Sequence, residues 1–245
     1  GWRWNGDGQC THIPYANNLP PRVAKGESIL GAWQVREVNQ QILVWYHPNK
    51  EAPTWEPEVI PEAAANHPDW GDMIIHTWEI NTHMQEMGEN AVDAAHFHYV
   101  HGTDEVPEAA FQNFDGHIRE GKFITRQPTP RGVVDGAIET RSQGAGLSVV
   151  RFTGIYDTLL LANVTPVGPE KTYASYAFIQ PRATEDTLGK TVGQAIIGNI
   201  CQQMSEDQII WDRKQYFERP LLCDGDGPFA KFRRWFSQFL VEPAA

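Results

Sequence analysis

Cysteine is scarce in this sequence. The 245 residues include only Cys10, Cys201 and Cys223, and no two of them form a C-x-x-C pair. An odd, scattered set argues against a disulfide scaffold and fits a reducing compartment, so we expect a cytoplasmic protein. None of the three has the spacing of a zinc or iron–sulfur ligand set. We therefore expect each cysteine to be structural.

A net positive charge and long apolar runs are also missing. The formal net charge is -11 at pH 7, and only the short stretch Lys231 to Arg234 is locally basic, which argues against a nucleic-acid partner. No run of about 18 apolar residues is present, so no membrane span is expected. The opening GWRWNGDGQC has no charged and then apolar segment, so it is not a signal peptide.

Two familiar catalytic motifs are absent as well. The sequence has no H-E-x-x-H, which weakens a zinc-protease hypothesis, and no G-x-S-x-G, which argues against a serine hydrolase. The chain also lacks an initiator methionine and opens on a tryptophan-rich turn, Trp2 to Gly8. This opening indicates the middle of a β-rich unit, so we expect the first residues of the parent protein to be missing.

What is present predicts an α+β protein. Residues 32–47 indicate two strands around an Asn-Gln-Gln turn, and residues 48–71, with five prolines, indicate a linker. Residues 72–83 predict a strand, residues 84–100 a helix that Gly102 stops, and residues 115–182 five closely spaced strands of an antiparallel sheet. The last third predicts two helices, over residues 189–217 and 228–240.

The stretch ENAVDAAHFHYVHG, residues 89–102, carries three of the nine histidines. Histidine is the commonest protein ligand for transition metals, and an added carboxylate completes an open facial site of the kind used by non-haem Fe(II) oxygenases. On an ideal helix, His98 and His101 align well, whereas His96 and His101 lie about 140° apart. The latter pair can chelate only if the helix is distorted or ends between them. Spacing alone leaves the pair open, and hydrogen-bonded, unliganded histidines remain the alternative.

Three segments of the chain resemble Rieske non-haem iron oxygenases. The motif N-x-x-D-x-x-H-x-x-x-x-H is present as Asn90, Asp93, His96 and His101, and GWRWNGDGQCTHIPYA resembles the end of a Rieske domain. The stretches SEDQIIWDRKQY and RPLLCDGDGPFAKFRRWFSQF resemble the C-terminal part of the 3-ketosteroid 9-alpha-hydroxylase oxygenase component. Together they span the whole chain.

The resemblance implies a set of site residues. It assigns His96 and His101 to iron and leaves His98 unliganded. The third ligand in the family comes from the C-terminal helix, which points to Asp207 ahead of Asp212. It makes Asp93 the carboxylate that links an iron-ligating histidine to the neighbouring subunit's cluster. It also implies that Asn90 lies near the iron.

The resemblance further implies a domain arrangement. Residues 1–47 would be the C-terminal remnant of a Rieske [2Fe-2S] domain, 48–71 a linker, and 72–245 a mononuclear-iron catalytic domain of helix-grip, START-like fold. A Rieske centre needs two cysteines and two histidines, as C-x-H and C-x-x-H. Only the fragment Cys10-Thr-His12 resembles it, so the cluster-binding part is expected to be missing by truncation.

The implied function is that of a monooxygenase oxygenase component. It would hydroxylate a bulky hydrophobic ring compound, a steroid by resemblance, using Fe(II) and O2. Electrons would come from NAD(P)H through a ferredoxin or flavin reductase and then through the cluster of an adjacent protomer, which implies a homotrimer. Two alternatives remain from the sequence: a lipid- or sterol-binding protein of the same fold, and a zinc hydrolase that uses the same residues. Metal content would separate them.

Overall fold

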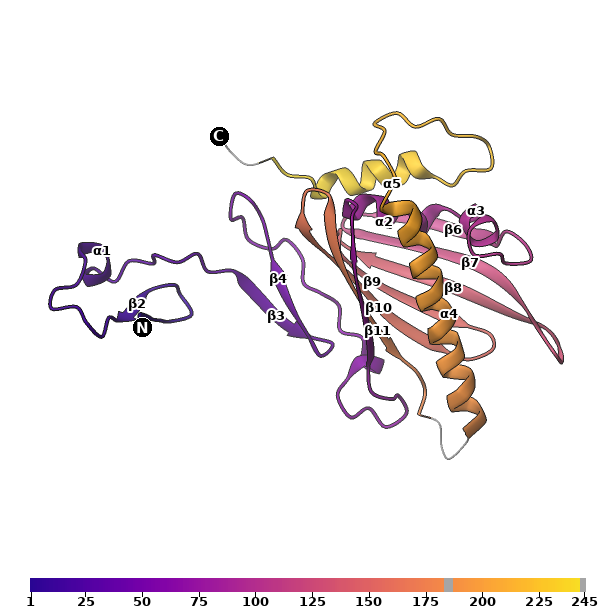
Figure 1. Cartoon of the computed structure of the whole chain (residues 1–245), viewed down its shortest axis with the longest axis horizontal. Helices are drawn as coiled ribbons and strands as arrows, with labels where there is room; N and C mark the ends of the chain where they lie inside the picture. Colours follow the sequence, from indigo (N-terminus) through magenta and orange to yellow (C-terminus); the bar gives the residue numbers. More distant parts are fainter. Residues whose placement is uncertain (183–186, 243–245) are drawn as a thin grey trace. The chain divides into compact units, whose positions relative to one another are not determined.

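The computed structural model of the chain describes residues 1–182 and 187–242 (Figure 1). The chain divides into one unit built on residues 1–58 and a second of residues 59–241. The boundaries that we place at residues 47 and 71 remain a prediction. Residues 183–186 and 243–245 of the predicted catalytic domain lie outside the described part.

The first unit consists of short strands and turns. Strand β1 (Arg3–Trp4) pairs with β2 (Cys10–His12), and helix α1 (Pro21–Ala24) follows. Strands β3 (Gln34–Val38) and β4 (Gln41–Trp45) form the hairpin predicted for residues 32–47. Asn39 and Gln40 both take positive φ angles, 54° and 58°, which a two-residue hairpin turn of matching twist requires.

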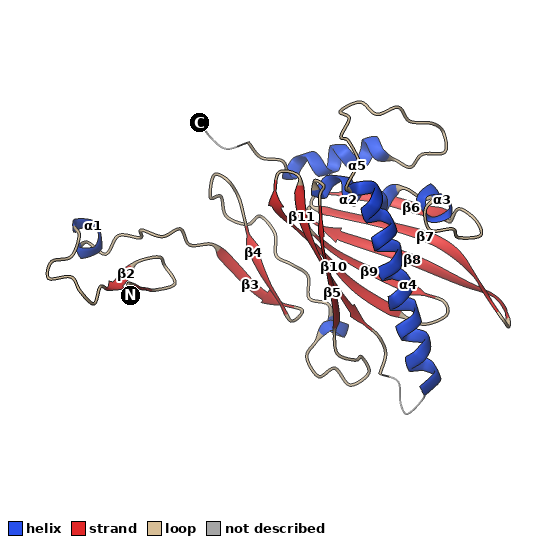
Figure 2. Cartoon of the chain, in the orientation of Figure 1, coloured by secondary structure: helices blue, strands red, loops and turns tan. Residues whose placement is uncertain are grey.

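The second unit is built on a seven-stranded antiparallel sheet of order β5-β11-β10-β9-β8-β7-β6 (Figure 2). The five predicted strands are its β7 to β11, and β5 is the strand predicted at residues 72–83. The seventh strand, β6, was not predicted, because its sequence EAAFQNFD has no β-branched residue and pairs only at the sheet edge with β7. The strands are β5 (Ile74–Ile80), β6 (Glu108–Asp115), β7 (Ile118–Thr129), β8 (Gly132–Gln143), β9 (Leu147–Thr153), β10 (Thr158–Gly168) and β11 (Lys171–Ile179).

The two faces of the sheet carry separate apolar layers. On β10, Leu160 and Ala162 pack with Ile197 and Ile200 of the long helix α4. The alternate residues Leu159 and Leu161 point to the other face and pack around Ala63 in the short helix η1 (Pro61–Ala63). This period of two is what a sheet buried on both faces requires.

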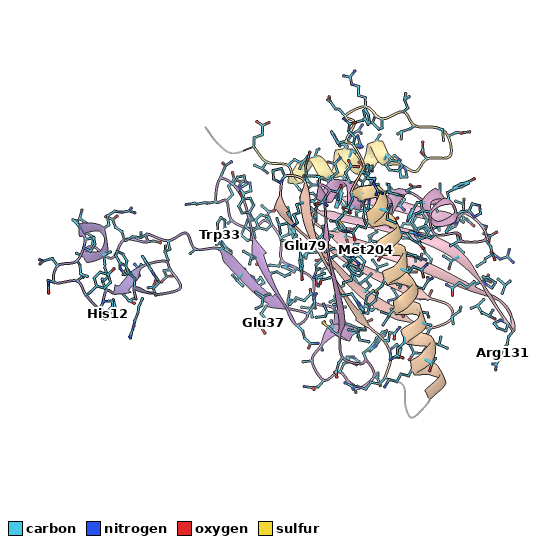
Figure 3. All side chains as sticks on the ribbon, viewed as in Figure 1. His12, Trp33, Glu37, Glu79, Arg131 and Met204 are labelled. Carbon is cyan, nitrogen blue, oxygen red and sulfur yellow. The ribbon has the colours of Figure 1, made fainter. Side chains whose placement is uncertain are left out.

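Helix α4 (Thr187–Trp211) crosses one face of the sheet (Figure 1). Figure 3 labels Met204, which is 3% exposed, at this crossing. The helix ends at Trp211, six residues before the predicted end at Phe217, and the 4%-exposed Trp211 side chain packs in one cluster with Ile80. Helix α5 (Phe229–Phe236) and η3 (Ser237–Phe239) occupy the range predicted for the second helix. No helix in the described ranges is long and apolar enough to cross a membrane.

The prediction of a single helix over residues 84–100 is wrong. The segment forms α2 (Met84–Glu89), a 3-10 turn η2 (Asn90–Val92) and α3 (Ala95–Tyr99). Asp93 interrupts them with extended backbone, φ -99° and ψ 102°, because its carboxylate accepts the amide hydrogens of Ala95 and His96. Such a capping bond favours a new helix start over continuation of the old one.

Candidate metal centre

Two histidines that are five positions apart converge with an aspartate of α4 that is distant in the sequence. One ligand atom each from His96, His101 and Asp207 lies within 4.8 Å of the others, and they form the only such group of three among the described residues. His96 lies on α3, and His101 follows the end of that helix. The helix therefore ends between the two histidines. On an ideal helix their side chains would point about 140° apart, so this ending is what allows both to bind one metal ion.

The ring of His96 is fixed from its Nδ1 side. Nδ1 bonds to the backbone carbonyl oxygen of Asp93, so Nδ1 carries the proton and Nε2 is left for a ligand. Burial lowers the pKa of His96, against the opposing charge of Asp207. A lowered pKa favours the neutral imidazole, which is the form that binds metal.

His101 is held between two carboxylates. Its Nδ1 lies 2.9 Å from Glu206 Oε2, and its Nε2 lies 3.4 Å from Asp207 Oδ1. The His101 side chain is only 2% exposed. Burial acts to lower the pKa of His101, but the hydrogen bonds and charges of Asp207 and Glu206 outweigh it and raise the pKa. As in His96, Nδ1 is engaged and Nε2 faces the third member of the group.

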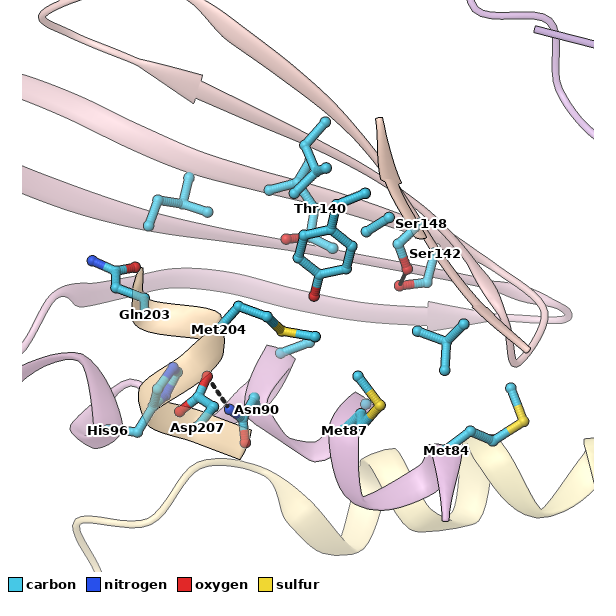
Figure 4. Close-up of a pocket in the computed structure, with 18 of the residues that line it drawn as sticks. Met84, Met87, Asn90, His96, Thr140, Ser142, Ser148, Gln203, Met204 and Asp207 are labelled. Atoms are coloured by element: carbon cyan, nitrogen blue, oxygen red, sulfur yellow. Dashed lines mark hydrogen bonds between the residues drawn. The ribbon is translucent and has the colours of Figure 1, made fainter. Parts of the chain in front are cut away.

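Asp207 is held in place by Asn90. Asn90 Nδ2 donates to Asp207 Oδ2 over 3.0 Å (Figure 4), and the other oxygen, Oδ1, lies 3.4 Å from His101 Nε2. The competing candidate, Asp212, lies outside the group, where its Oδ1 accepts the amide hydrogen of Asn81 at 2.8 Å. His98 is also outside, because its Nδ1 bonds to the carbonyl oxygen of Thr103. The structure thus brings together His96, His101, Asp207 and Asn90.

Asp93 acts here through its backbone as much as through its side chain. Its carbonyl oxygen meets His96 Nδ1, while its carboxylate Oδ1 accepts backbone N–H groups at the start of α3. Both contacts set the direction of the His96 ring. The role of the carboxylate as a bridge to a neighbouring subunit stays a prediction.

The turn η2, which carries Asn90, is pinned from two sides. Arg119, which is 1% exposed, donates through Nη2 to the carbonyl oxygen of Ala91. Burial lowers the pKa of Arg119 to about 10, so its side chain stays charged at neutral pH. From the other side Gly227 approaches so closely that a Cβ there would lie 1.6 Å from the Val92 carbonyl oxygen, and only glycine fits. These contacts fix Asn90 against Asp207.

Glu206 is the site residue that sequence reasoning missed. It stands next to Asp207 in the sequence, but its contact is with His101, 105 positions away. Its other carboxylate oxygen accepts from Gln202 Nε2 at 2.9 Å. Adjacent acidic residues on a helix are common, so the Glu-Asp pair carried no distinguishing signal.

Replacing Glu206 by alanine should weaken iron binding about 10-fold, because an unheld His101 ring loses its orientation. Glu206→Gln should retain most of the affinity, since an amide oxygen can still accept from Nδ1. Competition of each variant with a ferrous chelator measures the affinity. Equal affinities for Glu206→Ala and the unmodified chain would refute this role.

An apolar cavity of about 200 Å³ opens directly onto the histidine–aspartate group. His96, His101, Asn90 and Asp207 line one end, and Met84, Met87 and Met204 line its length (Figure 4). A second cavity of about 540 Å³ adjoins it, since the two share five lining residues. The shared residues are Phe97, Ile138, Phe152, Ile200 and Gln203.

The donor chemistry fits one metal ion but no iron–sulfur cluster. Two imidazoles with free Nε2 atoms and one carboxylate are the set that suits a non-haem Fe(II) site with open positions. A Rieske cluster needs paired cysteines and histidines. Cys10 is buried against the carbonyl of His12, Cys201 lies on α4, and Cys223 is exposed in the loop before α5. They do not form such a set.

Sequence comparison places the chain among known proteins. The model of the 3-ketosteroid 9alpha-hydroxylase C-terminal domain matches residues 44–240. A 3-ketosteroid-9-alpha-monooxygenase oxygenase component from Rhodococcus rhodochrous is 31% identical, over 98% of this chain and 63% of its own length. A cholesterol 7-desaturase from Ciona intestinalis is 28% identical, over 99% of this chain and 54% of its own length. The chain thus spans less than two thirds of either relative.

Comparison with solved structures concerns the fold alone. The crystal structure of dicamba monooxygenase bound to dicamba matches with a TM-score of 0.73 at 16% identity, over 98% of this chain and 77% of that one. The match confirms the predicted α+β class, an antiparallel sheet with a long C-terminal helix.

Proposed function

The chain belongs to the 3-ketosteroid 9α-hydroxylase C-terminal domain family of Rieske-type oxygenases, and on that premise we propose that it is the catalytic part of a monooxygenase oxygenase component. One observation carries the proposal: the convergence of His96, His101 and Asp207 at the end of an apolar cavity. A ligand group alone fits many metalloproteins. Its position at a cavity closed by sheet and helix favours chemistry on a hydrophobic molecule.

His96, His101 and Asp207 would hold one ferrous ion. A two-histidine, one-carboxylate set supplies oxygen activation at the open positions of bound iron. The carbonyl of Asp93 and the carboxylate of Glu206 hold the two rings with Nε2 toward the ion. Asn90 holds one carboxylate oxygen of Asp207 and leaves the other free to ligate.

The reaction would insert one atom of O2 into a C–H bond of a steroid-like ring compound. The second oxygen atom leaves as water, with two electrons supplied from NAD(P)H through a ferredoxin or flavin reductase and two protons taken from solvent. The apolar side chains of Met84, Met87 and Met204 would orient the substrate and exclude water from the site. The scattered cysteines support a cytoplasmic location.

The [2Fe-2S] cluster of the family would lie outside this sequence, with residues 1–47 as the end of its domain. Electrons would pass to the site from a neighbouring protomer through Asp93 in a homotrimer. The partly buried Asp93 carboxylate, two residues from the start of α3, supports a position between the site and a partner.

Metal analysis of the purified chain after anaerobic loading tests the proposal. We expect about one iron per chain, with ferrous iron retained through gel filtration. Zinc retained in place of iron would favour a hydrolase, and a metal-free protein that binds sterol tightly would favour a carrier. Either result would overturn the oxygenase assignment.

A further inference from the structure

The sheet wall of the site cavity is apolar except for the hydroxyl of Tyr176 on β11 and one cluster of smaller hydroxyl side chains. These three side chains, Thr140 and Ser142 on β8 and Ser148 on β9, line the cavity together (Figure 4). Thr140 and Ser142 are two positions apart and so share a face, and Ser148 is the direct cross-strand partner of Ser142. Their neighbours on the same wall are Ile138, Val150, Phe152, Leu160, Ala162 and Val164.

Some O–H donors of the hydroxyl cluster have no acceptor among the described residues. Ser148 Oγ donates to Ser142 Oγ over 2.9 Å, which occupies one of the pair's two O–H groups. Ser142 is 8% exposed, and no further partner for its hydroxyl is found in the described ranges. Nor does the side-chain hydroxyl of Thr140 have a hydrogen-bond partner there. Two O–H donors therefore face an apolar cavity unpaired, which is unfavourable unless a ligand or water satisfies them.

Ser142 and Ser148 lie in the part of the cavity away from the histidines. Figure 4 shows Ser142 and Ser148 well apart from His96 and Asp207, with Met204 between them. Along β8, Ile138 pairs with Phe123, whose ring contacts Phe97 beside His96 at 5.7 Å between centroids. Ser142 is four residues further on, roughly 13 Å along the strand. The strand therefore carries Ser142 away from the aromatic contact beside His96.

We propose that Thr140, Ser142 and Ser148 form a hydrogen-bonding subsite that receives an acceptor oxygen, a ketone above all, at the end of the substrate remote from the reacting carbon. This inference rests on the proposed function, because it assumes that the cavity holds the substrate. It adds that these three hydroxyls are the groups that bind such an oxygen and select for it. The apolar wall alone would not distinguish a ketone from the parent hydrocarbon.

The test uses three steroids with one skeleton: 5α-androstan-3-one, 5α-androstan-17-one and the hydrocarbon 5α-androstane. Quenching of tryptophan fluorescence reports binding to the iron-loaded, anaerobic chain, since Trp211 lines the cavity. We expect the unmodified chain to bind at least one ketone about 5- to 10-fold more tightly than the hydrocarbon. In the triple variant Thr140→Val, Ser142→Ala, Ser148→Ala this preference should fall to about one.

Ser175→Ala is the matched control, because Ser175 lies on β11 of the same sheet but outside the cavity lining, and it should keep the preference. The single variants Ser142→Ala and Thr140→Val should each lower it if the triple variant does not fold. An unchanged preference in the folded variants, or no preference in the unmodified chain, would overturn the inference. Iron content is measured in the same samples. Retained iron without a ketone preference would refute the subsite alone, whereas lost iron would refute the proposed function.

Discussion

Asp207→Ala should remove iron from the protein. Asp207 supplies the only carboxylate of the ligand group, and its loss leaves two imidazoles whose open side faces an apolar cavity. Loss of supporting residues around metal ligands already weakens binding about 10- to 100-fold, so loss of a ligand should exceed that range. Iron per chain after gel filtration measures the effect. We expect it to fall from about one to near zero.

Asp212→Ala is the matched control. Asp212 lies five positions after Asp207, but its carboxylate accepts the amide hydrogen of Asn81 and takes no part in the group. The control should therefore retain its iron. Full iron retention in Asp207→Ala, or equal loss in both variants, would refute the assignment of Asp207 as a ligand.

Glu89→Ala should lower the free energy of unfolding by about 3–5 kcal/mol. The Glu89 side chain is 3% exposed, and Arg233 Nε on α5 donates to it at 2.6 Å. Lys214, just after α4, lies 3.3 Å from its other oxygen and also pairs with Glu86. This cluster joins the segments that surround the metal centre. Removing Glu89 leaves Arg233 partly buried without its carboxylate.

Glu79→Ala is the comparison for the stability measurement. Glu79, labelled in Figure 3 on β5, pairs with Lys171, and its side chain is 65% exposed. Because exposed ion pairs contribute little, we expect a loss of at most about 1 kcal/mol. Urea denaturation followed by circular dichroism measures both variants. Similar small losses for Glu89 and Glu79 would contradict a structural role for the buried cluster.

The sequence alone predicts the sheet better than it predicts the site. Closely spaced β-branched and aromatic runs, separated by turn signals, mark β7 to β11. The ideal-helix assumption, however, favours His98 with His101. The break at Asp93 depends on a carboxylate capping the next helix, a local competition that periodicity does not report. Only the resemblance to a known family selects His96.

Contacts across the chain are the part that sequence could not predict. The bond from Asn90 to Asp207 spans 117 positions, and the bond from His101 to Glu206 spans 105. Each depends on where α4 crosses the sheet, which is set by packing of residues such as Met204 and Trp211. Secondary-structure propensity and residue spacing are local properties of the sequence, so they do not predict where α4 crosses the sheet.

The most direct test of the central claim is to locate the iron. Crystals of the iron-loaded chain, measured with X-rays on both sides of the iron absorption edge, give the position of iron from its anomalous scattering. We expect one strong peak enclosed by His96 Nε2, His101 Nε2 and Asp207. A peak elsewhere, or a well-loaded protein with no peak at these three residues, would contradict it.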